Sequence, residues 1–191
     1  FDLVKWYSYI IDEDILNTNT FIFRVDASEK IGTGHLQRCL LLAKYFINKE
    51  DWDVIFLTQQ TQSEIIINQA GFKCIKVSEK YSSVSDFIKT LNKPAVVLAD
   101  INSKAIFNNI NSYTEYIQSL DKDSEILITF EDLVDYPYPT NIVIIPYVGA
   151  EKLGLLESEK VTYLLGPKYF PVRDEFQNSK KLLISKKAKK I

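Results

Sequence analysis

The residue with the clearest chemical potential is His35, the only histidine among the 191 residues. It follows a glycine turn, Gly32-Thr33-Gly34, with an apolar strand-like run before the turn and a helical pattern directly after it. In α/β proteins, this junction of a strand's carboxyl end and a helix's amino end commonly carries reactive groups. A histidine titrates near neutral pH, so His35 is a candidate for proton transfer, the alternative being a capping or structural histidine.

The glycine turn before His35 indicates a loop that approaches a ligand closely. Glycines at 32 and 34 tolerate unusual backbone angles, and the free N–H groups at a helix start bind anions such as phosphate. The dinucleotide fingerprint is absent because Gln37 stands at its third glycine position, and there is no Walker lysine. The alternative is that the glycines only form a tight turn and contact no ligand.

Five charged residues are further candidates for the same site. Arg24 and Asp26 flank the end of the first predicted strand and either pair with each other or place Asp26 in a cleft. Arg38 lies one turn into the helix, either on its surface or holding the loop. Asp100 and Asp132 end or follow later strands, where carboxylates line clefts or cap helices.

Short apolar runs alternate with helical patterns along most of the chain, which predicts an α/β fold with an open, parallel, Rossmann-like sheet and helices on both faces. The predicted strands are 21–25, 53–57, 73–77, 95–99, 125–129, 142–145 and 162–165. The predicted helices are 1–16, 35–48, 62–70, 84–91, 112–120 and 169–178. We expect residues 1–20 to form a helix and linker, 21–180 a domain, and 181–191 a lysine-rich linker to a further domain.

The composition bounds the class of protein. Hydrophobic residues make up 46% and charged residues 25% of the chain, enough for a substantial core, and a net charge of −2 argues against nucleic acid. Cys39 and Cys74 are far apart and the chain has one histidine, so we expect no zinc site, and Cys39 falls on the apolar side of its helix. No apolar run suggests a membrane span or signal peptide, so we expect a cytoplasmic protein.

Two motifs resemble a known family. The stretch RVDASEKIGTGHLQRCLLLA closely resembles the opening motif of a sugar-nucleotide hydrolase family, which includes the UDP-sugar hydrolase of the pseudaminic acid pathway and related spore-coat polysaccharide biosynthesis proteins. The segments LLGPKY at 164–169 and VRDEF at 172–176 resemble that family's second motif, LLGPxY followed by LRxEF. The resemblance covers residues 21–191.

The resemblance implies the N-terminal half of a two-domain, GT-B-type enzyme. It implies hydrolysis of the anomeric C–O bond of a UDP-linked deoxy-amino sugar, without metal or cofactor, with His35 as the base that activates water. The C-terminal domain would supply most of the nucleotide site. The substrate-binding residues that we infer are Arg24, Asp26, Gly32, Thr33, Gly34, Arg38, Asp100, Asp132 and Tyr169, although a structural role for Tyr169 and Arg173 is as plausible.

Two alternatives stay open, the first because the same base would serve it and the second because the sequence departs from the family pattern. Glu131-Asp132 stands where the family commonly has Asp-Asp, Asp100 lacks a following tyrosine, and Ile145-Pro146-Tyr147 replaces a polar segment. One alternative is a glycosyltransferase of the same architecture, in which an acceptor hydroxyl replaces water. The other is a non-catalytic domain of a multidomain polysaccharide-biosynthesis protein.

The ends of the chain indicate missing neighbours. The chain starts at Phe1 and contains no methionine, so we expect it to be part of a longer protein, with a C-terminal domain beyond residue 191. The helix at 1–16 weakly resembles the last helix of nucleotide-sugar cytidylyltransferases, which suggests a fused or associated cytidylyltransferase; the alternative is a plain amphipathic helix packed on the sheet.

Overall fold

The fold comes from a computed structural model that describes residues 20–49, 52–78, 82–91, 93–102, 110–130, 140–154 and 161–172. The predicted helix at 1–16, the carboxylate of Asp132, Arg173 and the lysine-rich segment 181–191 lie outside these residues.

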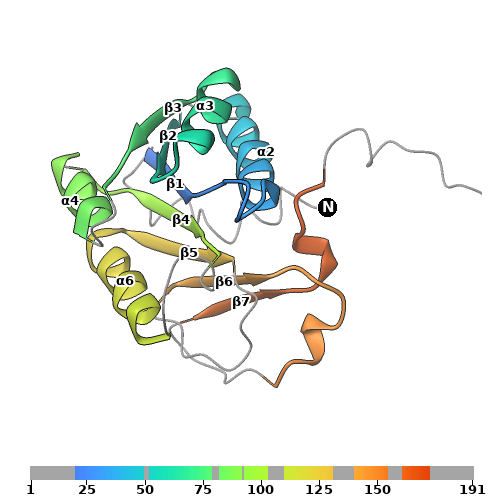
Figure 1. The fold of residues 1–191 in the computed structure, drawn as a ribbon. Helices are drawn as coiled ribbons and strands as arrows, with labels where there is room; N and C mark the ends of the chain where they lie inside the picture. The colour runs from blue at the N-terminus through green and yellow to red at the C-terminus, as the bar shows by residue number, and fades with distance from the viewer. Residues whose placement is uncertain are drawn as a thin grey trace, which may run out of the picture.

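Seven parallel strands form one sheet in the order β3-β2-β1-β4-β5-β6-β7 (Figure 1). All seven predicted strands are confirmed, with ends that differ by at most one residue. Most of them are continuous apolar runs, which are typical of strands buried on both faces. Their bounds are Thr20–Val25 (β1), Asp53–Thr58 (β2), Lys73–Lys76 (β3), Val96–Asp100 (β4), Ile126–Phe130 (β5), Ile142–Ile145 (β6) and Thr162–Leu165 (β7).

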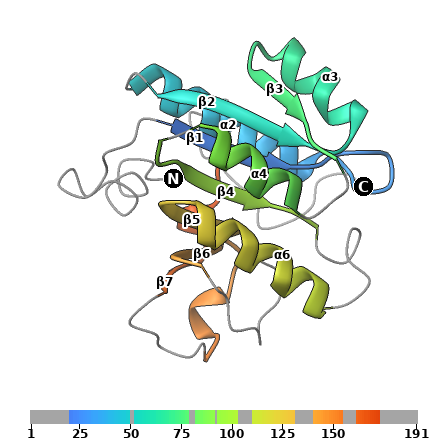
Figure 2. The same cartoon turned by 90° about the vertical axis from the view of Figure 1, so that its left-hand side faces the viewer.

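Helices cover both faces of the sheet, as predicted. Figure 2 shows α4 and α6 side by side on one face, where Val84, Ile88, Tyr113 and Ile117 pack against β1, β2, β4 and β5. On the other face α2 and α3 pack against a second core that includes the phenylalanines of β1. The helices span Gly34–Lys49 (α2), Thr61–Gln69 (α3), Ser82–Thr90 (α4) and Ile110–Asp123 (α6).

The chain reverses its direction of travel across the sheet between β1 and β4. From β1 it runs through β2 to the edge strand β3, and it then crosses back to pair β4 with the other side of β1. Val25 at the end of β1 lies beside Asp100 at the end of β4. Open α/β sheets bind ligands outside the carboxyl ends of strands at such a switch point. A ligand site is therefore expected at the loops that follow β1 and β4.

The helix predicted at 169–178 is wrong over its first residues. Pro167–Tyr169 forms a single 3-10 turn, η2, and Phe170 is already extended, with φ −80° and ψ 122°. Pro171 explains the difference, because the residue before a proline is pushed out of the helical region. A second 3-10 turn, η1, spans Ala150–Lys152 after β6.

Within the described ranges, no helix combines the length and the apolar character that crossing a bilayer would require.

Candidate functional site

His35 lies in the first turn of α2, directly after the glycine loop. Gly32 adopts φ +84°, which favours glycine, and its N–H donates a hydrogen bond to the Ser28 carbonyl at 2.7 Å. The Ser28 hydroxyl accepts from the Ile31 N–H at 3.2 Å. These bonds fold the loop back on itself, so that α2 starts at Gly34 at the carboxyl edge of the sheet. The His35 side chain remains 18% exposed there.

Asp100, the last residue of β4, is the partner of His35. The imidazole Nδ1 lies 2.6 Å from Asp100 Oδ1, and the Asp100 side chain is fully buried. The contact joins the loop after β1 to the end of the neighbouring strand, across 65 positions in the sequence. It occurs at the switch point of the sheet, so two of the predicted site residues meet where the fold predicts a site.

Arg38 clamps the same carboxylate from α2. Its Nε donates to Oδ2 of Asp100 and its Nη2 donates to Oδ1, a bidentate ion pair. Nη2 also lies 3.0 Å from His35 Nδ1. The guanidinium carbon sits 4.3 Å from the centroid of the Phe130 ring at the end of β5, a cation–π contact. Arg38 is therefore held on two sides, and its side chain is only 16% exposed.

Cys39 completes the surroundings of Asp100. Its Sγ lies 3.6 Å from Oδ2 as a thiol donor, and the residue is fully buried. Burial, and then the negative charge of Asp100, raise the pKa of the Cys39 thiol well above its ordinary value. Cys39 therefore stays protonated and can donate. The prediction that Cys39 lies on the buried side of its helix is confirmed.

Arg24 and Asp26 form a separate network on the opposite face of the sheet. Arg24 Nη2 lies 2.6 Å from Asp26 Oδ2, and Arg24 Nε donates to the hydroxyl of Tyr116 on α6 at 2.9 Å. Asp26 also accepts from the Thr58 hydroxyl and the Gln59 N–H, both at 2.8 Å. Both charged side chains are buried, so of the two possibilities left by the sequence, the structure shows pairing and not a cleft-facing Asp26.

The charge state of Asp26 follows from this network. Burial alone would raise the pKa of the Asp26 carboxyl, but the Arg24 guanidinium and the hydrogen bonds from Gln59 and Thr58 outweigh it. The pKa of Asp26 consequently lies below its ordinary value. Burial likewise opposes the charge on Arg24, and its contacts with Tyr116 and Asp26 outweigh that cost and raise its pKa.

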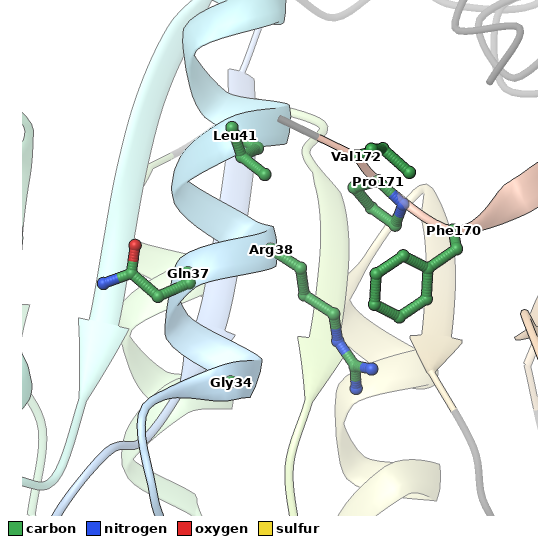
Figure 3. A pocket seen from close by; sticks show the side chains of 7 residues that line it. All are labelled: Gly34, Gln37, Arg38, Leu41, Phe170, Pro171 and Val172. Carbon is green, nitrogen blue, oxygen red and sulfur yellow. The ribbon is translucent and has the colours of Figure 1, made fainter. Parts of the chain in front are cut away.

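A pocket of about 270 Å³ opens beside Arg38, between α2 and the segment that follows η2. Figure 3 shows Arg38 extending from α2 toward the Phe170 side, whereas Gln37 points the other way. Phe170, Pro171 and Val172 form the facing wall, and Gly34 lies at one end. The space next to the His35 loop is therefore bounded by mostly apolar atoms.

The remaining predicted site residues fall into three groups. Gly32, Thr33 and Gly34 are exposed in the loop, and a Cβ added at either glycine would meet open space. Tyr169 is buried in the core shared with α2, the structural role that the sequence left open. Asp132 belongs to the segment 131–139, which the structure does not describe.

Two residues of the site were not predicted. Cys39 is four residues after His35 and so shares its helix face, a spacing that could have placed it near the same carboxylate. Phe130 ends β5 beside β4, but its stacking on Arg38 depends on how far the arginine reaches, which spacing does not reveal. In the described part of the chain, no group of three or more His, Cys, Asp or Glu side chains is arranged to hold a metal ion.

Comparison with known proteins gives one distant relative. The uncharacterized protein MJ1062 of Methanocaldococcus jannaschii is 30% identical over 176 residues, which cover 86% of this chain. The chain spans only 33% of that protein's length. No protein-family model matches the chain, and no solved structure matches it.

Proposed function

We propose that this chain is the base-carrying half of a nucleotide-sugar hydrolase, in which water attacks the anomeric carbon of a UDP-linked deoxy-amino sugar. The observation that carries the proposal is the contact between His35 Nδ1 and the buried Asp100 carboxylate at the switch point. A histidine oriented by a buried carboxylate is the usual arrangement of a general base, and it recurs on unrelated folds.

The proposed step uses the free nitrogen of His35. With Nδ1–H donating to Asp100, Nε2 carries the lone pair, and no hydrogen bond from the described residues occupies it. Nε2 takes a proton from water as the water oxygen forms a bond to the anomeric carbon. The bond from that carbon to the phosphate oxygen breaks, and its electron pair leaves with UDP. The sugar keeps the new hydroxyl.

The amino end of α2 supports a phosphate or a developing negative charge near His35. The first turn of α2 contains no acidic residue that would neutralise the positive end of the helix dipole. The neighbouring glycines leave open space above the backbone. Oriented N–H groups of this kind stabilise charge that develops on a leaving group.

The resemblance of the glycine loop and of the LLGPKY segment supplies the substrate class. It also implies a GT-B-type partner domain, with the uridine site, in a further part of the protein. A relative of which this chain covers a third is compatible with that arrangement.

Replacing His35 by Asn in the protein at its full natural length tests the proposal. We expect UDP release from a UDP-linked diacetamido-trideoxyhexose to fall about 10²–10⁴-fold, the usual contribution of a general base, with little change in substrate affinity. Lys44→Ala, an exposed change farther along the same helix and outside the pocket, is the control and keeps its rate. A folded His35→Asn protein with near wild-type turnover disproves the mechanism, and UDP release that requires an added sugar acceptor identifies a transferase instead.

A further inference from the structure

The Asp100 carboxylate is saturated with hydrogen-bond donors. A carboxylate offers about four lone-pair positions, two on each oxygen. Oδ1 accepts from Arg38 Nη2 and from His35 Nδ1, while Oδ2 accepts from Arg38 Nε and from the Cys39 thiol. The side chain is fully buried. Asp100 therefore has neither exposure nor acceptor capacity left for a substrate hydroxyl.

The distances around His35 Nδ1 determine which tautomer fits. If Nδ1 lacked a proton, its lone pair would face the Oδ1 lone pairs at 2.6 Å, an unfavourable contact. If Nδ1 carries the proton, it donates to Oδ1 at that distance. The 3.0 Å separation between Nδ1 and Arg38 Nη2 is then that of two donors sharing one acceptor. The arrangement favours Nδ1–H and leaves Nε2 unprotonated.

We infer that Asp100 and Arg38 are positioning residues, which together hold His35 as the Nδ1–H tautomer with Nε2 as the proton acceptor. Arg38 fixes the carboxylate in one orientation through two parallel bonds, and the Phe130 ring supports the guanidinium from its face. Lysine could not replace it, because an ammonium has neither the planar fork nor the flat face. The catalytic meaning of this assembly rests on the proposed function, but the tautomer itself does not.

The tautomer is measured directly from the imidazole ¹⁵N shifts and the ring ¹H–¹⁵N couplings of the ¹⁵N-labelled 191-residue chain. His35 is the only histidine, so its signals need no further assignment. The spectra are recorded over a pH series, and the neutral imidazole is read from the plateau that the ¹⁵N shifts reach at high pH. We expect a protonated Nδ1 and an unprotonated Nε2, the reverse of the preference of free histidine in water.

Asp100→Asn is the diagnostic variant. The amide NH2 of the new asparagine can face either His35 or Arg38. Facing Arg38 Nε it would meet only another donor, so it should face His35 and donate to Nδ1. His35 should then switch to the Nε2–H tautomer. Asp123→Asn is the matched control. It removes a carboxylate that contacts Ser85 and Lys89 on the α4–α6 face, and it should leave the His35 signals unchanged. In the natural-length protein, Asp100→Asn should lower turnover on the order of 10²–10⁴-fold with little change in KM, because the wrong tautomer offers no base.

A wild-type chain with an Nε2–H imidazole overturns the inference, and it does so even if Asp100→Asn fails to fold. A folded Asp100→Asn chain that keeps the Nδ1–H tautomer overturns it as well. The spectra need no substrate. An inactive protein with the expected tautomers would therefore disprove the hydrolase proposal and leave the positioning role intact.

Discussion

At the residue scale, the ion pair between Arg38 and Asp100 should contribute strongly to stability. Asp100 is fully buried, so Arg38→Met would leave a buried carboxylate without its cation. Breaking a buried pair by removing one partner typically costs about 3–5 kcal/mol, and we expect a loss of that order in the free energy of unfolding measured with urea.

Lys89→Met is the matched control for that measurement. Lys89 lies 3.4 Å from Asp123, but its side chain is 58% exposed, and surface pairs contribute less than about 1 kcal/mol. Equal losses in the two variants would show that Asp100 is not a buried charge that depends on Arg38.

The buried pair of Arg24 and Asp26 predicts a specific loss of stability in acid. The pKa of Asp26 is lowered in the folded protein, so its contribution is complete above the ordinary aspartate pKa of about 3.9 and is lost as pH falls through the lower, folded value. Urea unfolding between about pH 6 and pH 3 should show this decline, and Asp26→Asn should flatten it while lowering stability at neutral pH. Asp53→Asn, in an exposed pair with Lys93, should behave like wild type. An Asp26→Asn chain with the wild-type acid profile would contradict the prediction.

The sequence singled out His35, Arg38 and Asp100, which the structure brings together, but not how these three side chains are connected. The position of His35 after a glycine turn was enough to single it out. Its contact with Asp100 could not be derived, because it depends on β1 and β4 being neighbours across 65 positions. Likewise, a carboxylate at a strand end can face either side of the sheet. Asp26 turns toward Arg24 and Thr58, whereas Asp100 turns toward α2, and that difference decides which of them reaches His35.

At the element scale, α2 is held on the sheet by Phe46. Its ring stacks on Phe21 of β1 with centroids 4.3 Å apart and lies 6.1 Å from the ring of Trp52. Phe46→Ala should lower the free energy of unfolding by about 3–5 kcal/mol, because a large buried side chain is replaced by a cavity. The next residue, Ile47, is 49% exposed, so Ile47→Ala on the same helix should change stability by only about 0.5 kcal/mol. Thermal or urea unfolding of both variants provides the measurement, and similar losses would contradict the packing described for α2.

The elements themselves were predictable because strand and helix patterns are local. Strands such as Ile142–Ile145 are unbroken apolar runs, and α3 ends just before Gly71, whose φ is +85°. The prediction of a helix from Tyr169 was wrong because Pro171, two residues later, forces the residue before it out of the helical region. The segment then runs extended beside α2, where Phe170 walls the pocket.

At the scale of the whole molecule, the proposal assigns the uridine site to another part of the protein. We therefore expect calorimetry of UDP with the 191-residue chain to show a Kd weaker than about 1 mM, equivalent to less than about 4 kcal/mol of binding free energy. His35→Asn should give the same result, because the base adds little ground-state affinity. Micromolar binding by this chain would place the nucleotide site on the 191 residues themselves.

The neighbouring positions of β1 and β4 have a consequence for the order of folding. We expect helices and β–α pairs, which close short loops, to form early, whereas pairing β4 with β1 must close a loop that contains α2, β2, α3, β3 and α4. His35 follows β1 and Asp100 ends β4, so the two residues come together only when that loop closes. A nascent or partly folded chain can thus contain a complete glycine loop and a formed α2 and still lack the carboxylate that orients the imidazole. The contact that orients the imidazole therefore forms only when β4 pairs with β1.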